Sequence, residues 1–569
     1  MSHYEASGNR SLQTTRSSPR PVFGGPARPR CSSHTWLSRT QLSTRAQQGS
    51  AQTRTESQPN KPKVVVIGGG WAGFGATKHL AQEGYEVTLL DGSPNPGGLA
   101  AGWRTAQGRA VEAGIKGFWY QYHNIFALLK ELGIPWPLTD WTKSGFWGPD
   151  GLRIESPVFS SQPRLPTLLG QFVHTFPLFR TLSLADRATM VPVLAAVLDF
   201  DASPENFQRY DQMSAKELFQ RYGVSQRLYD EFLKPLLLVG LFAPPEQISA
   251  ASMLETFYFY TLAHQADFDV CWCKGSVSEL IFKPLVDLIQ GLGGRIQGGR
   301  LASDLDVNPE TGRVQGVIAR SRDGSETTYP ADAVIFAVGI TGMQKLIGAS
   351  PTLAARPEFR RIMTLQGLDV MATRLWFDRR VETRFPSNVL SGFEETTGGT
   401  FFNLNQLQDE YKDVAEGVIA ADFYHSNELM ALSDEEIVQK VHDTLKICEP
   451  GFRDAKVVDS AVLRFSKAVT HFNPGSLQGR PRQWTSFGNV FMAGDWVKDV
   501  NHGAKGLSQE RAFVTGLTAA NLVVKHLGCG EPAKLLDTEP DEPHIALGKE
   551  LNKRLQSTLS LFGANSLGL

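Results

Sequence analysis

The stretch VVVIGGGWAGFG, residues 64–75, decides the fold of this chain. It begins as a bare apolar run, passes through Gly68, Gly70 and Gly73, and leads into a helix-forming segment. In such a strand–turn–helix unit the first glycine allows a tight turn, the second lets the backbone approach a pyrophosphate, and the third lets the helix pack closely on the strand. The N–H groups at the helix start, at Trp71 and Ala72, can then hold phosphate oxygens. The stretch therefore predicts a dinucleotide-binding βαβ unit.

An acidic residue stands at the distance that such a unit requires. A second predicted strand, residues 86–90, ends in Asp91, eighteen residues after Gly73. A carboxylate at this place can accept hydrogen bonds from a ribose diol. Strand, turn, helix and acid agree, which favours a dinucleotide site over a glycine-rich loop without a ligand.

A second glycine pair indicates which dinucleotide is bound. Gly97 and Gly98 follow Asp91 within the segment GSPNPGG, and this pair resembles the extended motif of FAD-binding flavoproteins, which nicotinamide-only proteins generally lack. Small residues there let backbone amides turn toward the pyrophosphate. Many of these flavoproteins have an Arg next, where this chain has Leu99, and the nearby Arg104 is our candidate for the missing charge. We therefore predict FAD as the cofactor.

A third block near the end of the chain, FMAGD at residues 491–495, resembles the segment that ends the last strand of these flavoproteins. The resemblance implies that Gly494 and Asp495 meet the ribityl or phosphate region of the flavin. The following helix, with Gln509 and Glu510 at its start, would point its positive end at the pyrimidine ring, where reduced flavin carries negative charge. The alternatives are that Asp495 only caps a helix and that Glu510 is only a surface acid.

Further blocks resemble the carotenoid desaturases of the plant and cyanobacterial type, the phytoene and zeta-carotene desaturases, within the flavin amine oxidase superfamily. The resemblance covers about residues 63–525. The blocks that carry it are Glu112-Ala113-Gly114 with residues 121–133, residues 235–257, Lys274-Gly275-Ser276, and Ala493-Gly494-Asp495-Trp496 followed by Glu510 and Ala512. The chain departs from the family pattern around the expected substrate entrance and flavin, at Lys116, Gly117, Trp119, the insertion 500–505, and Arg511 in place of a Gly.

The resemblance implies an FAD-dependent oxidoreductase that desaturates or isomerises a carotenoid or a related isoprenoid. Unactivated C–H bonds are not acidic, so their oxidation needs a hydride or electron acceptor, which oxidised flavin supplies and side chains do not. An apolar tunnel with few acid–base groups suffices for this chemistry, and a membrane quinone is the implied final oxidant. Two alternatives stay open: a flavin amine oxidase, and a pigment-binding flavoprotein that has lost turnover.

Two groups of side chains are candidates for the substrate site. Polar residues near the flavin, which could stabilise its anion or help an isomerisation, are Lys498, His502, Lys505, Glu510 and Arg511. Aromatic residues that could wall a polyene channel are Phe118, Trp119, Tyr120 and Tyr122. The alternatives are a solvated loop for the first group and ordinary core packing for the second. No metal site is predicted, because Cys271 and Cys273 have no second Cys/His pair at metal spacing.

The predicted fold class is α/β, with a Rossmann-type FAD-binding domain (GR2-like) that is discontinuous in sequence. We assign residues 61–133, 275–342 and 489–530 to this domain. The segments between them, residues 134–274 and 343–488, are predicted to form an interleaved α+β substrate domain, with the substrate pocket at the interface.

The two ends of the chain have a different character. The first 60 residues contain eight Arg, no Lys and two acids and are rich in Ser and Thr, which resembles an organelle transit peptide, with a plain disordered tail as the alternative. This leader fits a plastid better than a mitochondrion. Without it 49 basic and 56 acidic residues remain, a net charge of −7, which gives no reason to expect nucleic acid as a partner. Residues 531–569 are predicted to form a peripheral tail.

No apolar run reaches the roughly 18 residues of a membrane span. The most apolar stretches are residues 188–198 and 236–243. They could line an apolar tunnel or dip into a membrane surface, or they could be core helices. We therefore predict contact with a membrane that is peripheral at most.

Overall fold

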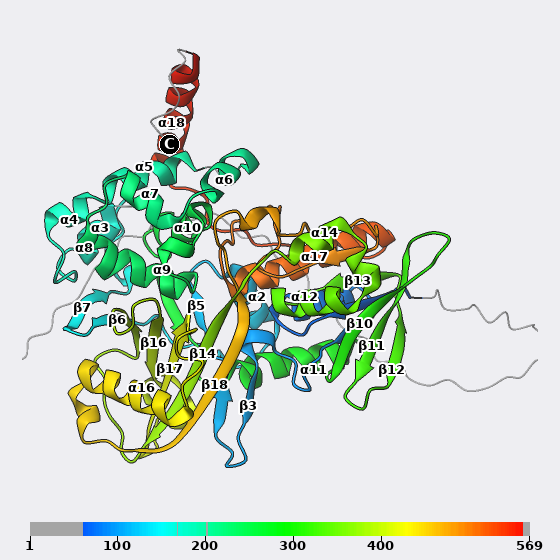
Figure 1. Cartoon of the computed structure of the whole chain (residues 1–569), viewed down its shortest axis with the longest axis horizontal. Coiled ribbons are helices and arrows are strands. Elements are labelled where there is room, and N and C mark those ends of the chain that lie inside the picture. The colour runs from blue at the N-terminus through cyan, green and yellow to red at the C-terminus, as the bar shows by residue number, and fades with distance from the viewer. Residues whose placement is uncertain (1–60, 168, 201–202, 562–569) are drawn as a thin grey trace, which may run out of the picture. The chain divides into compact units, whose positions relative to one another are not determined.

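The glycine-rich turn lies at the carboxyl edge of a parallel sheet with the order β19-β13-β1-β2-β9 in the computed structural model, which describes residues 61–167, 169–200 and 203–561 (Figure 1). The predicted leader, residues 1–60, lies outside the described residues. The strands of this sheet are β1 (Lys63–Ile67), β2 (Glu86–Leu90), β9 (Arg295–Gln297), β13 (Ala333–Phe336) and β19 (Val490–Met492). Three distant stretches of sequence thus supply one sheet, and the strands that the sequence predicts at residues 86–90, 295–297, 333–337 and 490–492 are confirmed in it.

Both faces of this sheet are buried, which explains why its strands are apolar throughout. Helices α1 (Trp71–Gln82), α11 (Lys283–Gly291) and α17 (Gln509–Leu527) pack with the side chains of one face. Helix α12 (Ile340–Ala349) packs with those of the other. The remaining elements on that second face are α13 (Pro351–Ala354), α14 (Pro357–Ile362) and the antiparallel strands β10 (Arg300–Val307), β11 (Val314–Ser321) and β12 (Glu326–Pro330).

A second, mostly antiparallel sheet has the order β18-β14-β17-β16-β15-β6-β7. Its strands are β6 (Ser144–Gly148), β7 (Gly151–Ser156), β14 (Gly367–Phe377), β15 (Ser387–Leu390), β16 (Gly398–Asn403), β17 (Gly417–Tyr424) and β18 (Val457–Thr470). Helix α16 (Asp434–Cys448) packs on one face, and Figure 1 shows the helices α3 to α10 on the other side of the sheet. The sequence predicts a hairpin at residues 146–154, strands at 368–376 and 418–423 and a helix at 434–447, and all of these are confirmed here.

The helical layer accounts for both of the most apolar stretches. Its helices are α3 (Leu169–Thr175), α4 (Leu184–Ala188), α5 (Val191–Asp199), α6 (Pro204–Asp211), α7 (Ala215–Arg221), α8 (Gln226–Leu228), α9 (Lys234–Gly240) and α10 (Ala250–Phe257). Helix α5 buries Val193 and Ala196 in the core of this layer, so it is in part a core helix. Helix α9 packs toward the second sheet. Among the described residues, no helix has the length and apolar character needed to cross a membrane.

Short elements join the two sheets. They are the ribbons β3 (Gly102–Arg104) with β4 (Ala110–Glu112) and β5 (Gly117–Trp119) with β8 (Val270–Trp272), and the helices α2 (His123–Glu131) and α15 (Leu404–Leu407). The described residues belong to a single compact unit, so the division into a cofactor and a substrate domain stays a proposal.

The end of the chain differs from the predicted peripheral tail. Residues 531–542, which we call the strap, run back over α2 before the final helix α18 (Pro543–Leu561). Asn124 exchanges two hydrogen bonds with the backbone of Leu536, at 2.7 and 2.8 Å. His264 Nε2 lies 2.9 Å from the carbonyl oxygen of Pro540. A polar and proline-rich composition favours a loose segment, but here the polar groups are used to bind the strap.

Candidate cofactor and substrate cavity

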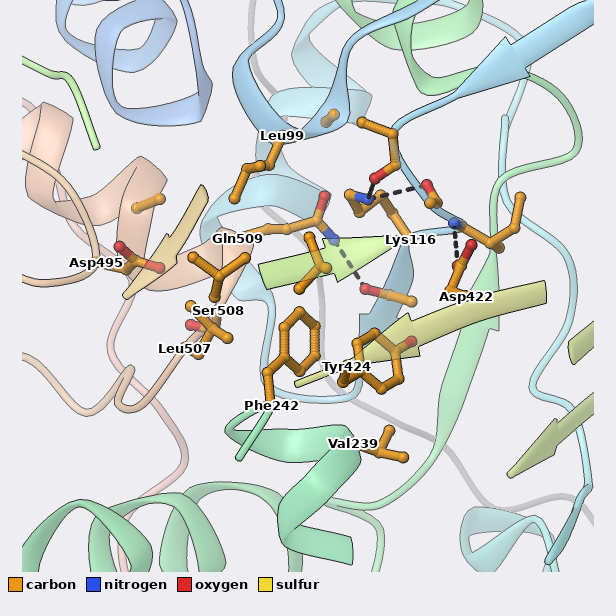
Figure 2. Close-up of a pocket in the computed structure, with 18 of the residues that line it drawn as sticks. Leu99, Lys116, Val239, Phe242, Asp422, Tyr424, Asp495, Leu507, Ser508 and Gln509 are labelled. Atoms are coloured by element: carbon orange, nitrogen blue, oxygen red, sulfur yellow. Dashed lines mark hydrogen bonds between the residues drawn. The ribbon is translucent and has the colours of Figure 1, made fainter. Parts of the chain in front are cut away.

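A cavity of about 670 Å³ is lined by residues of both large sheets. Its volume falls in the ordinary range for a cofactor or ligand pocket. One end, which we call the cofactor end, is lined by the glycine-rich turn, Asp91 and the start of α17. The other, the substrate end, is lined by α9 and strands β6, β14, β16 and β17 of the second sheet. Figure 2 shows side chains from both ends facing the same space.

The glycines of the turn divide into two kinds. Gly68 has φ +107°, and a Cβ on Gly73 would lie 1.8 Å from the carbonyl oxygen of Gly68, so these two are required by the protein's own packing. Gly70 differs, because a Cβ there would meet only the Cα of Gly98, at 3.8 Å. Gly70, Gly97 and Gly98 line the cavity. The packing of the protein does not require a glycine at position 70, so the bare backbone there is available to contact the pyrophosphate of a dinucleotide.

Asp91 lies at the end of β2 and lines the cavity, as predicted for the ribose acid. Its Oδ2 accepts a hydrogen bond from Gly69 N at 2.6 Å, and its Oδ1 accepts one from Ser93 N at 2.7 Å. Burial raises the pKa of Asp91, and the two backbone donors oppose this effect. Each carboxylate oxygen keeps lone pairs beyond these bonds, so the group can still accept from two hydroxyls.

The start of α17 ties the cofactor end together. Gln509 Oε1 accepts from Trp71 Nε1 at 2.8 Å, and Gln509 Nε2 donates to the carbonyl oxygen of Gly117 at 2.9 Å. Asp495 lines the cavity beside it, with Gly494 and Leu99. Burial raises the pKa of Asp495 to about 6, although the guanidinium groups of Arg511 and Arg480 favour its charged form.

Several predicted residues lie outside the cavity lining. Glu510 faces the N-terminus of α2, where Oε1 accepts from Asn124 N and Oε2 from Ile125 N, at 2.7 and 3.0 Å. Burial raises the pKa of Glu510 to about 7. Arg511 donates to the carbonyl oxygens of Asp495, Val497 and Ala504, at 2.7 to 3.0 Å. Both side chains are used by the protein's own backbone, which favours a structural over a catalytic role.

The remaining polar candidates are engaged in the same way. Lys498 donates to the carbonyl oxygen of Leu477 at 3.0 Å, and His502 lies 2.9 Å from that of Leu536 in the strap. Lys505 pairs with Glu255 at 3.5 Å. Arg104, our candidate for the missing Arg, instead pairs at the surface with Glu279 and Glu410, at 2.8 Å each.

Two of the four predicted aromatic residues line the cavity. Trp119 packs edge-on to Tyr260 with ring centroids 5.0 Å apart, and the Tyr122 hydroxyl lies 3.1 Å from that of Tyr260. Phe118 is buried in the core below Trp71, and Tyr120 faces Trp141. Sequence alone does not separate these positions, because all four fall in one short segment. Other apolar residues at the substrate end are Leu236, Val239, Phe242 and Phe268.

The structure also places a charged group that sequence reasoning missed. Asp422 of β17 lines the substrate end, and its Oδ2 accepts from Ile115 N at 2.8 Å. Lys116 lies beside it, donating to the carbonyl oxygens of Ala113 and Gly114 at 2.7 and 2.9 Å. One feature of the sequence could have identified Asp422: it is a carboxylate within the otherwise apolar stretch VIAADFY. A charged residue in such a stretch is unusual, and the structure shows that β17 is buried along its whole length. The sequence marks Lys116 only as a departure from the family pattern.

Comparisons with known proteins agree with this geometry. The model of the family "Flavin containing amine oxidoreductase" matches residues 71–524. The chain is 25% identical to a probable zeta-carotene desaturase of Synechococcus elongatus, over 81% of this chain and 98% of that protein. It is 26% identical to the chloroplastic/chromoplastic 15-cis-phytoene desaturase of Arabidopsis thaliana, over 85% of each.

Solved structures show the same fold at lower identity. Cyclohexylamine oxidase from Brevibacterium oxydans superposes with a TM-score of 0.59 at 14% identity, covering 82% of this chain and all of the other. Putrescine oxidase bound to putrescine gives the same TM-score and identity, covering 82% of this chain and 99% of the other. The predicted α/β fold with a Rossmann-type FAD-binding region is thereby confirmed.

Proposed function

The chain belongs to the family of flavin-containing amine oxidoreductases and is an FAD-dependent oxidoreductase, and from this premise we propose that it desaturates a carotenoid or a related isoprenoid. The observation that carries the proposal is the cavity itself: a cradle of bare backbone opens directly into a space walled by aromatic and aliphatic side chains. The curated relatives described above are carotene desaturases, which supports the same substrate class.

For the cofactor we propose the following arrangement. Gly70, Gly97 and Gly98 hold the pyrophosphate, and Asp91 accepts hydrogen bonds from the ribose. Gly494, Asp495 and Gln509 line the cavity beside this site and would hold the flavin half. When bound, the flavin accepts a hydride from a saturated C–C unit of the substrate. Trp119, Tyr260 and Phe242 exclude water and hold the chain of the substrate against it, which requires apolar surface rather than hydrogen bonds.

The surface of the helical layer supports peripheral contact with a membrane. Large apolar side chains of α3 to α5 and the segment after α3 are 43 to 63% exposed: Leu169, Phe172, Val173, Phe176, Leu184 and Val191. Single apolar residues on a protein surface are common, but several large ones close together in the sequence indicate a contact surface. Such a surface suits the interface of a bilayer. We propose that the protein takes its substrate from a plastid membrane through this surface and passes electrons to a membrane quinone. The plant relatives, named as chloroplastic, support the compartment.

The test uses the purified full chain under anaerobic conditions. Its flavin absorbance is followed after adding 15-cis-phytoene, zeta-carotene, putrescine or cyclohexylamine. Bleaching by a carotene and recovery on adding a quinone supports the proposal. Bleaching by an amine alone would make the protein an amine oxidase. A stably yellow protein that no compound bleaches would point to a pigment-binding flavoprotein without turnover.

A further inference from the structure

The substrate end of the cavity contains one carboxylate. Titratable side chains that line the cavity are Asp91, Lys116, Tyr122, Tyr260, Asp422, Tyr424 and Asp495. Asp91 and Asp495 lie at the cofactor end. The three tyrosines have pKa values raised above the ordinary phenol value by burial, which excludes them as bases near neutral pH. Among the described residues of the lining, only Asp422 and Lys116 remain, and Lys116 already donates to two carbonyl oxygens.

The sheet register places Asp422 on the cavity side. It lies opposite Ala372 of β14 and Thr400 of β16, whose small side chains leave room above it. Side chains alternate along a strand, so Tyr424 shares this face, while Ala421 and Phe423 belong to the core that packs on α16. Figure 2 shows Asp422 and Tyr424 with Lys116 along the same wall.

The loop over Asp422 connects it to the cofactor end. A Cβ on Gly114 would lie 3.1 Å from Asp422 Oδ2, so the loop and the carboxylate are in close contact. The same loop donates Ile115 N–H to Asp422 and, two residues later, offers the Gly117 carbonyl to Gln509 at the start of α17. Asp422 is therefore one short loop away from the residues proposed to hold the flavin.

We propose that Asp422 is the proton acceptor of the desaturation, an inference that rests on the proposed function. One C–H bond of the substrate gives up a hydride, with both electrons, to oxidised flavin. The neighbouring carbon gives up a proton to the Asp422 carboxylate, and the electron pair of that second C–H bond becomes the new C=C bond. The proton leaves to solvent when the product departs, which restores the carboxylate.

The surroundings of Asp422 suit this role. Its Oδ1 is buried and has no hydrogen-bond partner among the described residues, whereas Oδ2 is bound to Ile115. A buried carboxylate oxygen without a hydrogen-bond partner destabilises the folded protein, and such groups are found preferentially at functional sites. Tyr424 and Phe242 stack with centroids 4.1 Å apart at the same wall, and their ring faces can stabilise a developing positive charge.

The charges around Asp422 set the pH at which it can act. Burial raises its pKa to about 6, the cations of Lys116 and Arg374 oppose the rise, and the carboxylate of Glu112 adds to it. Tyr424, the remaining titratable neighbour, stays neutral because burial raises its pKa. The Asp422 carboxylate is thus ionised at neutral pH, yet its pKa is close enough to accept a proton efficiently. Activity limited by this group rises as the pH increases through about 6.

The experiment compares the full-length protein with its Asp422→Asn variant. Asn keeps the shape and an oxygen that can accept from Ile115 but cannot take up the proton. We expect the variant to retain FAD, measured by its flavin absorbance, and to bind carotene, measured by quenching of the protein's tryptophan fluorescence. Anaerobic flavin bleaching by the carotene should slow by about 100-fold or more, the usual contribution of a general base. The matched control is Asp459→Asn on β18, a surface residue that pairs with Arg109, and it should bleach at the normal rate.

Two further measurements do not depend on turnover by Asp422→Asn. Infrared spectra of the unmodified protein, recorded without substrate, should gain carboxylic acid absorption as the pH falls through about 6. This gain should be smaller in Asp422→Asn, in which the other buried acids, Asp495 and Glu510, still titrate in this range. Lys116→Met removes a cation that favours the carboxylate, so the acid limb of the bleaching rate should move up by about one pH unit. This variant keeps the inference testable if Asp422→Asn does not fold.

The outcomes distinguish the proposed function from the role of Asp422. If carotene bleaches the unmodified protein and Asp422→Asn bleaches within about threefold of it, the proposed function stands and the inference is overturned. An acid limb that stays in place in Lys116→Met, together with infrared changes that are equal in the unmodified protein and in Asp422→Asn, overturns it as well. If carotene bleaches neither protein, the proposed function fails and the inference falls with it.

Discussion

The two ends of the cavity are built in different ways. The cofactor end is made mostly of backbone: a turn of glycines, N–H groups at helix starts, and two acids that follow strands, Asp91 and Asp495. The substrate end is made of side chains from α9 and from strands of the second sheet that lie far apart in the sequence. Backbone sites depend on short contiguous segments, whereas side-chain sites depend on how distant strands pair. Substitutions should therefore act differently at the two ends.

The largest effect is expected for Gly73→Val, which tests whether the turn is required by the fold itself. A Cβ at this position would overlap the carbonyl oxygen of Gly68, at 1.8 Å, and no flexible side chain is there to move. We expect loss of soluble, cooperatively folding protein, measured by yield and thermal unfolding. The control is Gly348→Ala in α12, where a Cβ meets nothing within 4 Å and where helix propensity predicts a gain of roughly 0.5–1 kcal/mol. A stable Gly73→Val protein would contradict the close approach of α1 to the turn.

Gly70→Ala should separate cofactor binding from folding. The added methyl group is tolerated by the protein, with its nearest neighbour at 3.8 Å, but it projects into the proposed pyrophosphate cradle. We expect an unchanged unfolding temperature of the flavin-free protein and a loss of at least about tenfold in FAD affinity, roughly 1.4 kcal/mol. Titration of FAD into flavin-free protein measures the affinity. Normal FAD binding would place the pyrophosphate elsewhere.

This contrast explains which features can be predicted from the sequence and which cannot. The turn at Gly68, the acid at Asp91 and the closing block at Gly494 each lie within a few residues that specify their own geometry, so their places in the fold are predictable. The place of Glu510 in a helix start predicts a position at the flavin. The sequence does not reveal that Glu510 accepts three hydrogen bonds at the start of α2, from Asn124 N, Asn124 Nδ2 and Ile125 N. Asp422 escapes prediction because its environment arises only when β17 pairs with β14 and β16.

A smaller effect is expected from changing the pH, which alters the charge on His264 and so the stability of the strap that His264 contacts at Pro540. Burial lowers the pKa of His264, but the hydrogen bond and charge of Asp267, with smaller contributions from Pro540 and Glu539, raise it to about 9 overall. The charged form stabilises the folded state, so this contribution is full below the unfolded pKa of about 6.5 and is lost as the pH rises through about 9. Proteolysis of residues 536–541 should accelerate by about tenfold between these limits.

His264→Gln should abolish that dependence, because Gln keeps a donor but no titratable charge. His544→Gln is the control, since His544 is largely exposed and contacts Glu542 and the carbonyl oxygen of Thr167, which lie outside the cleaved residues 536–541. Cleavage that is equally slow at both pH values in the unmodified protein would show that the charge on His264 does not hold the strap.

The smallest effect on the fold is expected from Phe172→Ser combined with Phe176→Ser, which tests the exposed apolar surface of the helical layer. Both rings are 45% exposed and pack on each other with centroids 6.0 Å apart, so their loss removes little from the core. If the patch lies in a bilayer interface, the double variant should bind liposomes of plastid lipids at least about tenfold more weakly, because each buried ring contributes roughly 1.5–3 kcal/mol. Co-sedimentation measures the binding. The control is Leu301→Ser, which should bind normally. Leu301 is 64% exposed and lies on β10, outside the helical layer that carries the patch. Equal binding by all three proteins would remove the membrane from the proposal while leaving the chemistry of the cavity untouched.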